Sequence, residues 1–151
     1  MVALPSKRVL VALDDTQTPG AVFDGAREFA ARYRARLVFL HVVVPEDGLT
    51  LPGRELGPEL AGLVRHAQRE LRGLADQVPA ENVDSTVVDV GEPWRVICRL
   101  ATELGVDMVL LGSHRATALE KVFGTTATRV VAHCDRTVVV LRETPAAPDP
   151  A

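Results

Sequence analysis

Apolar residues along the chain gather into five short runs that have the length of β-strands. The runs cover residues 8–13, 36–44, 85–90, 106–111 and 137–141. Most of them are apolar at nearly every position, which is typical of strands that are covered by helices on both faces. The pattern therefore predicts a buried sheet.

Between these runs, apolar residues recur at helical spacing in four segments, which predicts helices over residues 20–35, 58–78, 93–104 and 125–133. Tyr33 in the first segment and Leu63 in the second belong to the faces expected to point inward. Pro93 stands where a helix start tolerates proline, and Gly105 stands where a glycine commonly ends a helix. Strands that alternate with helices in this way pair in parallel through right-handed crossovers. The predicted fold is one doubly wound α/β domain over residues 6–143.

Ligands of doubly wound sheets bind outside the carboxyl ends of the strands, where the strand order reverses. The residues directly after strands one, two and four are therefore the first candidates for a site. Asp14 follows strand one and is placed to accept hydrogen bonds from a ribose. Gly124, Thr125 and Thr126 open the last helix, where backbone amides and two hydroxyls suit an anion. Together these residues indicate a mononucleotide pocket.

Each of these residues also has a purely structural interpretation. Thr125 and Thr126 are typical residues for capping the last helix, and caps are far commoner than phosphate sites. Asp14 or Asp15 equally suits a helix cap or an Asx turn. The pocket gains weight because the pieces converge on one edge of one sheet. The polar segment 45–57, which is long for a loop inside a compact domain, is a second candidate for a functional element.

Several segments resemble the universal stress protein family. They are residues 7–16 (KRVLVALDDT), residues 40–42 (LHV), Gly91-Glu92-Pro93, and residues 106–141 with Gly112-Ser113-His114 and Gly124-Thr125. The resemblance covers about residues 6–143 in matching order and spacing. It implies a Rossmann-like sheet of order 3-2-1-4-5, a homodimer through the last strand, Thr137–Leu141, and bound ATP in one branch of the family.

The nucleotide-binding branch of that family carries a glycine, two residues, a second glycine, nine residues, and a third glycine followed by Ser or Thr. Gly112 matches the first glycine, and Gly124 with Thr125 matches the last pair. Arg115 replaces the middle glycine, and the loop is one residue short. A Cβ at this position could push phosphate away, whereas a guanidinium can itself bind phosphate bidentately. Arg115 is therefore a candidate phosphate-binding residue that this sequence itself suggests, and it is not carried over from the family's motif.

The resemblance implies the roles of the remaining site residues. Ala12 and Asp14 are expected on the adenine and ribose side, and the backbone of Val42 is expected to hold the adenine. Leu111 and Gly112 are expected along the ribose and phosphate path, with Gly124, Thr125 and Thr126 on the phosphates. The expected cofactor is ATP or a related adenine nucleotide, either alone or with Mg²⁺ bound to its phosphates.

Composition limits the other possibilities. The chain has 151 residues, 17 Lys and Arg against 20 Asp and Glu, and a net charge of −3. This balance argues against a protein that coats nucleic acid or anionic lipid. No apolar run has the length of a membrane span, and a cytoplasmic protein is expected. Residues 144–151 are rich in Pro and Ala and predict a flexible tail.

Cys98 and Cys134 have neither CxxC nor metal-ligand spacing, so buried reduced thiols are expected. No Ser/His/Asp set, Walker lysine or metal cluster is visible, so we expect a stress sensor or switch with slow ATP hydrolysis at most. One alternative is a family member that binds no nucleotide and acts through dimer and partner contacts. Another is a phosphoacceptor receiver domain, but Val90-Gly91 and Arg142-Glu143 stand where its third carboxylate and its lysine would be required.

Overall fold

The computed structural model describes residues 7–17, 20–45, 56–113 and 125–142 of the chain. These residues form five strands, four α-helices and one short 3₁₀ helix. In chain order the elements are β1 (Arg8–Ala12), α1 (Gly20–Tyr33), β2 (Arg36–Val43), α2 (Pro58–Ala75), η1 (Ala80–Asn82), β3 (Val83–Val90), α3 (Pro93–Glu103), β4 (Met108–Gly112), α4 (Thr125–His133) and β5 (Thr137–Leu141).

The five strands form one parallel sheet in the order β3-β2-β1-β4-β5, as the sequence predicts. β1 is the central strand, with β2 on one side and β4 on the other. The chain adds strands in one direction up to β3 and then crosses to the opposite side of β1. The strand order therefore reverses between β1 and β4, and β3 and β5 are left as the two edges.

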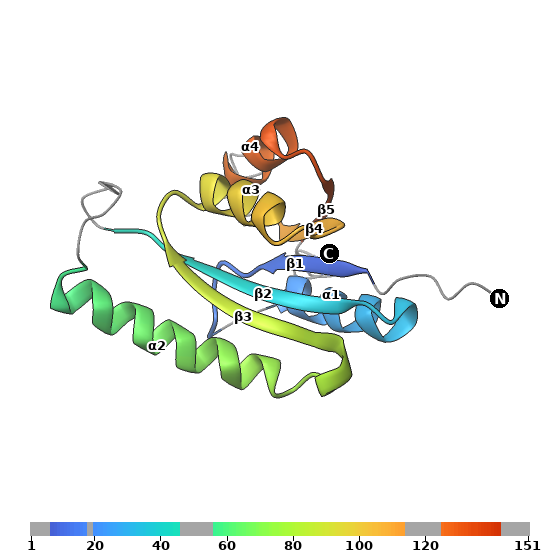
Figure 1. The fold of residues 1–151 in the computed structure, drawn as a ribbon, viewed down its shortest axis with the longest axis horizontal. Coiled ribbons are helices and arrows are strands. Elements are labelled where there is room, and N and C mark those ends of the chain that lie inside the picture. Colours follow the sequence, from blue (N-terminus) through green and yellow to red (C-terminus); the bar gives the residue numbers. More distant parts are fainter. Residues whose placement is uncertain (1–6, 18–19, 46–55, 114–124, 143–151) are drawn as a thin grey trace, which may run out of the picture.

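Helices cover both faces of this sheet (Figure 1). α1 and α2 pack on one face, around a core that includes Val9, Val11 and Phe39. α3 and α4 pack on the other face, around Leu10 and Val109. Because neighbouring strand residues point to opposite faces, uninterrupted apolar strands supply both cores, which is why these strands lack a polar face.

Strand boundaries differ from the prediction at β3 and β4. β3 begins at Val83, before the predicted Ser85, and the short helix η1 precedes it. β4 begins at Met108 although Val106 is buried at 2% exposure. The backbone N–H of Val106 donates to the carbonyl of Ala101 and so belongs to the turn that ends α3. A buried apolar residue outside the strand ladder looks like strand in the sequence.

Two residues expected to face inward are exposed instead. Tyr33 is 58% exposed and packs its ring against Phe29 at the end of α1, with 4.8 Å between ring centroids. Leu63 is 51% exposed, and the buried face of α2 begins one turn later at Ala67. Helical periodicity identifies the inward side of a helix but not how far the helix runs past the core.

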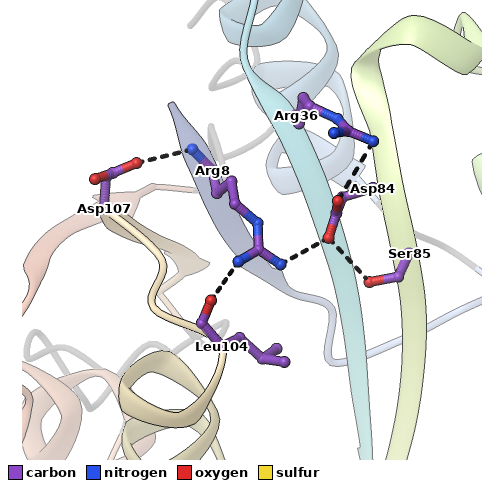
Figure 2. Close-up of polar contacts among 6 residues, drawn as sticks. All are labelled: Arg8, Arg36, Asp84, Ser85, Leu104 and Asp107. Atoms are coloured by element: carbon purple, nitrogen blue, oxygen red, sulfur yellow. Dashed lines mark hydrogen bonds and ion pairs between the residues drawn. The ribbon is translucent and has the colours of Figure 1, made fainter. Parts of the chain in front are cut away.

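A polar network lies at the end of the sheet where the strands begin, which we call its amino-terminal edge (Figure 2). The Arg8 guanidinium donates to Asp84 Oδ2 at 2.8 Å and to the carbonyl of Leu104, and Arg36 lies 3.4 Å from Asp84 Oδ1. Asp84 falls between the register pairs Leu37↔Val83 and Val38↔Ser85, so β3 holds one extra residue there. Such a bulge redirects a side chain, and here the Asp84 carboxylate reaches across β2 to Arg8 on β1.

Asn82 braces the same edge from just before β3. Its buried side-chain amide donates to the carbonyls of Ala30 and Ala35 at 3.2 and 3.0 Å. Those carbonyls flank the tight turn between α1 and β2, where Arg34 adopts a left-handed backbone with φ of 54°. Both amide hydrogens of Asn82 are therefore used inside the protein.

Candidate functional site

A pocket of about 370 Å³ opens at the carboxyl ends of the central strands. It lies where the strand order reverses, on the face of the sheet that α3 and α4 cover. The residues that line it come from three strands (β1, β2 and β4), from the loops after β1 and β2, and from the helices α3 and α4: Ala12, Leu13, Asp14, Leu40, Val42, Val44, Pro93, Ile97, Leu111, Gly112, Thr126 and Ala127. A largely apolar cavity with a few polar groups is typical of small-molecule sites.

The floor of the pocket is one row of residues across three strands. In the register of the sheet, Ala12 on β1 lies between Leu40 on β2 and Leu111 on β4. All three are buried in the core under α3 and α4. Because alanine is the shortest of the three, the row dips at its centre, and this dip leaves room for a flat apolar group between two leucines.

The walls of the pocket are the first turns of α3 and α4. Pro93 and Ile97 line it from α3, and Thr126 and Ala127 line it from α4. Because Thr126 is the second residue of α4 and lines the pocket, the amino-terminal end of this helix lies at the pocket. This end of a helix carries partial positive charge, which favours an anionic group.

Glu92, directly before Pro93, joins these two walls. Its carboxylate accepts hydrogen bonds from Trp94 Nε1 at 2.8 Å, Arg95 Nε at 2.8 Å and Arg129 Nη1 at 2.7 Å. The hydrogen bonds from Trp94 and Arg95, with the charges of Arg95 and Arg129, hold the pKa of Glu92 below its usual value. Since Arg129 belongs to α4, this cluster fixes the spacing of α3 and α4 at the pocket.

The loop after β1 carries Asp14 into the pocket lining and is anchored on its other side. His41 on β2 lies with Nδ1 2.8 Å from the carbonyl of Leu13, and the N–H of Leu13 donates to the Leu40 carbonyl at 2.8 Å. A carbonyl only accepts, so Nδ1 of His41 carries the hydrogen. Both the backbone N–H and the carbonyl of Leu13, the residue before Asp14, are therefore hydrogen-bonded to β2.

Asp15 and Thr16 fix the rest of this loop. Asp15 Oδ1 accepts from the N–H of Gln17 at 2.8 Å, which is the Asx turn that the sequence left open for Asp14 or Asp15. Thr16 donates its hydroxyl to Glu70 on α2, which also accepts from Gln17 at 3.2 Å. The Thr16 hydroxyl, assisted by Gln17 and by His66 2.7 Å away, lowers the pKa of Glu70.

Six of the nine predicted site residues line this one pocket: Ala12, Asp14, Val42, Leu111, Gly112 and Thr126. Thr125 begins α4 beside them. Arg115 and Gly124 lie outside the described residues, as do most of segment 45–57 and the tail 144–151. The sequence missed Pro93 and Ile97, whose only signal was the Gly91-Glu92-Pro93 segment at the start of a helix.

Gly112 has a packing reason to be glycine besides any ligand. A Cβ at this position would lie 2.7 Å from Cγ2 of Val22 on α1, closer than atoms in proteins approach. α1 thus packs directly over the end of β4. Substitution of Gly112 would disturb this packing whatever the pocket binds, so Gly112 is a poor position at which to test binding.

Within the residues that the structure describes, no helix is long and apolar enough to cross a membrane. The same residues contain no group of three or more His, Cys, Asp and Glu side chains that could hold a metal ion.

Comparison with known proteins identifies relatives over nearly the whole chain. The sequence model of the universal stress protein family matches residues 5–142. Universal stress protein A homolog 2 of Coxiella burnetii is 29% identical in an alignment 138 positions long, which covers 85% of this chain and 91% of that protein.

Solved structures share the fold. The hypothetical protein MJ0577 superposes with a TM-score of 0.72 at 20% identity, over 95% of this chain and all of the other. A universal stress protein family protein of Arabidopsis thaliana with AMP bound gives a TM-score of 0.60 at 21% identity, over 96% and 99% of the two chains. Two further structures of this fold are complexes with cAMP and with dAMP, the latter from Archaeoglobus fulgidus.

Proposed function

Since the chain belongs to the universal stress protein family, we propose that it binds an adenine nucleotide in the pocket between the carboxyl ends of β1 and β4 and acts as a stress sensor or switch. The observation that carries this proposal is the convergence of Ala12, Asp14, Val42, Leu111, Gly112 and Thr126 on one pocket. The AMP, cAMP and dAMP complexes of proteins with this fold support the choice of an adenine nucleotide.

The chemistry of the lining suits the parts of such a nucleotide. The adenine ring would lie on the apolar dip at Ala12, where the Val42 backbone can hydrogen-bond its edge. Asp14 would accept hydrogen bonds from the ribose hydroxyls. Thr126 and the first N–H groups of α4 would hold the phosphates, because the start of a helix favours negative charge.

The preferred nucleotide under this proposal is ATP. Gly124, Thr125 and Arg115 would extend the phosphate site beyond the described lining, and Mg²⁺ would accompany the phosphates. The chain would act as a switch with slow hydrolysis at most, since binding here requires only positioned donors, whereas efficient hydrolysis also requires a positioned water and stabilisation of the γ-phosphate charge.

The direct test is whether the protein carries a nucleotide. The full chain is purified without added ligand and denatured, and the released small molecules are identified by mass spectrometry. Titrations with AMP and ATP, with and without Mg²⁺, then measure affinity. We expect an adenine nucleotide in the first experiment or saturable binding in the second. Protein that releases none and binds none at millimolar ligand would overturn the proposal and favour a family member that acts through its contacts alone.

Gly124→Asp sharpens this test because it would bring a carboxylate to the proposed phosphate site. We expect loss of retained nucleotide while the oligomeric state stays unchanged. Gln77→Glu, which adds the same charge at an exposed position after α2, away from the pocket lining and from β5, is the control for charge alone. Unchanged nucleotide content in Gly124→Asp would count against the phosphate site.

We further propose a homodimer that forms through Thr137–Leu141. The supporting observation is that β5 is an edge strand whose valines are only partly buried. Val139→Lys should convert the protein to monomer in light scattering. Val88→Lys on β3, the opposite edge, is the matched control, because both valines are partly buried against the same core. An unchanged dimer in Val139→Lys would argue against this interface.

A further inference from the structure

A charged and aromatic cluster joins α3 to α4, which lie side by side on one face of the sheet (Figure 1). At its centre is Trp94, the one tryptophan of the chain. The guanidinium carbons of Arg95 and Arg129 lie 4.8 and 5.9 Å from the centroid of the Trp94 ring. The ring of His133 packs against the same ring at 4.7 Å between centroids. Because Arg129 and His133 belong to α4, the cluster spans both helices.

An ion pair between Glu92 and Arg129 completes this cluster beside the pocket. The distance from Glu92 Oε1 to Arg129 Nη1 is 2.7 Å, and the two side chains are 42% and 48% exposed. Glu92 directly precedes Pro93, which lines the pocket. Arg129 lies one helical turn after Thr126, which also lines it. One negative and one positive charge are therefore fixed next to the pocket walls, outside the described lining.

These two charges act in opposite directions on an anion in the pocket. The amino-terminal end of α4 favours negative charge, Arg129 adds to this attraction, and Glu92 opposes it. Hydrogen bonds from Trp94 and Arg95 hold the pKa of Glu92 below its usual value, so its carboxylate is ionised at neutral pH. Unscreened charges act over distances of about 10 Å at moderate salt, so neither side chain needs to touch a ligand to change its affinity.

We propose that Glu92 and Arg129 set how strongly the pocket prefers charged ligands over uncharged ones. Glu92 weakens binding for each negative charge on the ligand, and Arg129 strengthens it, so the pair keeps this preference moderate. The ligand is the adenine nucleotide of the proposed function, on which this inference rests, with its phosphates at the start of α4. Both residues therefore determine specificity through their charge.

Comparison of three ligands that differ in charge tests the proposal. Adenosine, AMP and ATP are titrated without Mg²⁺ into the full-length native chain, Glu92→Gln and Arg129→Gln, and each nucleotide affinity is divided by the adenosine affinity. We expect Glu92→Gln to raise the AMP ratio about threefold, and the ATP ratio about tenfold because ATP carries about twice the charge. Arg129→Gln should lower both ratios by similar factors.

The opposite signs separate a charge effect from a structural one. Both variants remove the same ion pair, so any loosening of α3 against α4 should weaken all three ligands alike and cancel in the ratios. Arg129→Lys, which keeps the charge and changes the geometry, should retain ratios close to the native ones. The shifts in both glutamine variants should shrink when the salt concentration is raised to about 0.5 M, since salt screens exposed charges.

Glu103→Gln is the matched control, because it removes the same charge from an exposed side chain at the far end of α3. Its ratios should stay close to the native ones. Ratios that shift in the same direction in Glu92→Gln and Arg129→Gln, or that stay unchanged in both, would overturn this proposal and leave nucleotide binding intact. A native chain that binds none of the three ligands would overturn the proposed function and this inference with it.

Discussion

The two ends of the sheet use polar residues in opposite ways. At the amino-terminal edge, Arg8, Asp84 and Asn82 direct their side chains at one another or at buried carbonyls. At the carboxyl edge the strand ends surround a pocket. The hydrogen-bonded cluster around Glu92 joins the two helices that line this pocket, and the cluster around Glu70 holds the loop after β1 from the other face of the sheet. At the first edge the polar groups bind one another and leave no pocket, so we call it the closed edge. At the second, the open edge, they fix the elements that surround the pocket.

This difference separates stability from binding. Polar groups that satisfy one another contribute to folding and offer nothing to a ligand. Polar groups that fix a pocket from outside keep its shape while its apolar lining stays accessible. Changes at the amino edge should therefore lower the free energy of unfolding and leave ligand affinity unchanged. Changes at the carboxyl edge should lower ligand affinity and leave the free energy of unfolding nearly unchanged.

Asn82→Asp should give the largest effect. The native amide donates both hydrogens to the carbonyls of Ala30 and Ala35, and a carboxylate can donate neither. Burying an unpaired charge against two carbonyls should lower the free energy of unfolding by about 3 kcal/mol or more. Urea denaturation measures this loss. Glu81→Gln, at the exposed neighbour, should stay within about 0.5 kcal/mol, and a similar small loss in Asn82→Asp would contradict the comparison.

Arg8→Ala should lower the free energy of unfolding by about 1–2 kcal/mol. It removes a 2.8 Å ion pair with Asp84 and the bond to the Leu104 carbonyl, although the guanidinium is partly exposed. Arg36→Ala is the matched control, because its contact with the same carboxylate is longer, at 3.4 Å, and half-exposed. We expect less than half the loss there. Equal losses would show that the partly buried hydrogen bond from Arg8 to the Leu104 carbonyl contributes little.

Much of the fold could be predicted because the periodicity of apolar residues that distinguishes strands from helices is a local property of the sequence. Errors appeared where tertiary packing decides the outcome. Val106 is as apolar as a strand residue, yet its N–H closes the turn after α3. Tyr33 has helical spacing, but α1 extends past the core at that point and the ring packs on Phe29.

The candidate site divides in the same way. Ala12, Asp14 and Val42 lie at or just after strand ends, and the ends of strands can be predicted from where the apolar runs of the sequence stop. Ile97 reaches the pocket only because α3 packs at a particular angle over the sheet, and no sequence period encodes this angle.

Asp14→Ala tests the open edge. If Asp14 accepts hydrogen bonds from ribose hydroxyls, its loss should weaken AMP binding about tenfold and leave a dideoxyribose analogue unaffected. Calorimetric titration of both ligands measures the difference. Asp15→Ala is the neighbouring control, because Asp15 supports the Asx turn and should not alter the preference for ribose. Ribose preference retained in Asp14→Ala would remove Asp14 from the site.

Asp84→Asn tests the closed edge with the smallest expected effect, about 1 kcal/mol at pH 7. The hydrogen bond and charge of Arg8, with the charge of Arg36, lower the pKa of Asp84 in the folded protein below its ordinary value of 3.8. Because the folded pKa is depressed, the ionised carboxylate stabilises the fold above that ordinary value.

This stabilisation should disappear as pH falls through the lowered pKa of Asp84, since the carboxyl is then protonated in both states. The difference in unfolding free energy between the native chain and Asp84→Asn should therefore be constant from pH 7 to about pH 5 and shrink below about pH 4. Urea denaturation at each pH measures it, and Asp24→Asn on the exposed side of α1 gives the baseline. A difference that did not shrink at all between pH 5 and pH 3 would mean that Asp84 acts through its shape within the bulge, and the closed edge would then be a packing feature and not an electrostatic one.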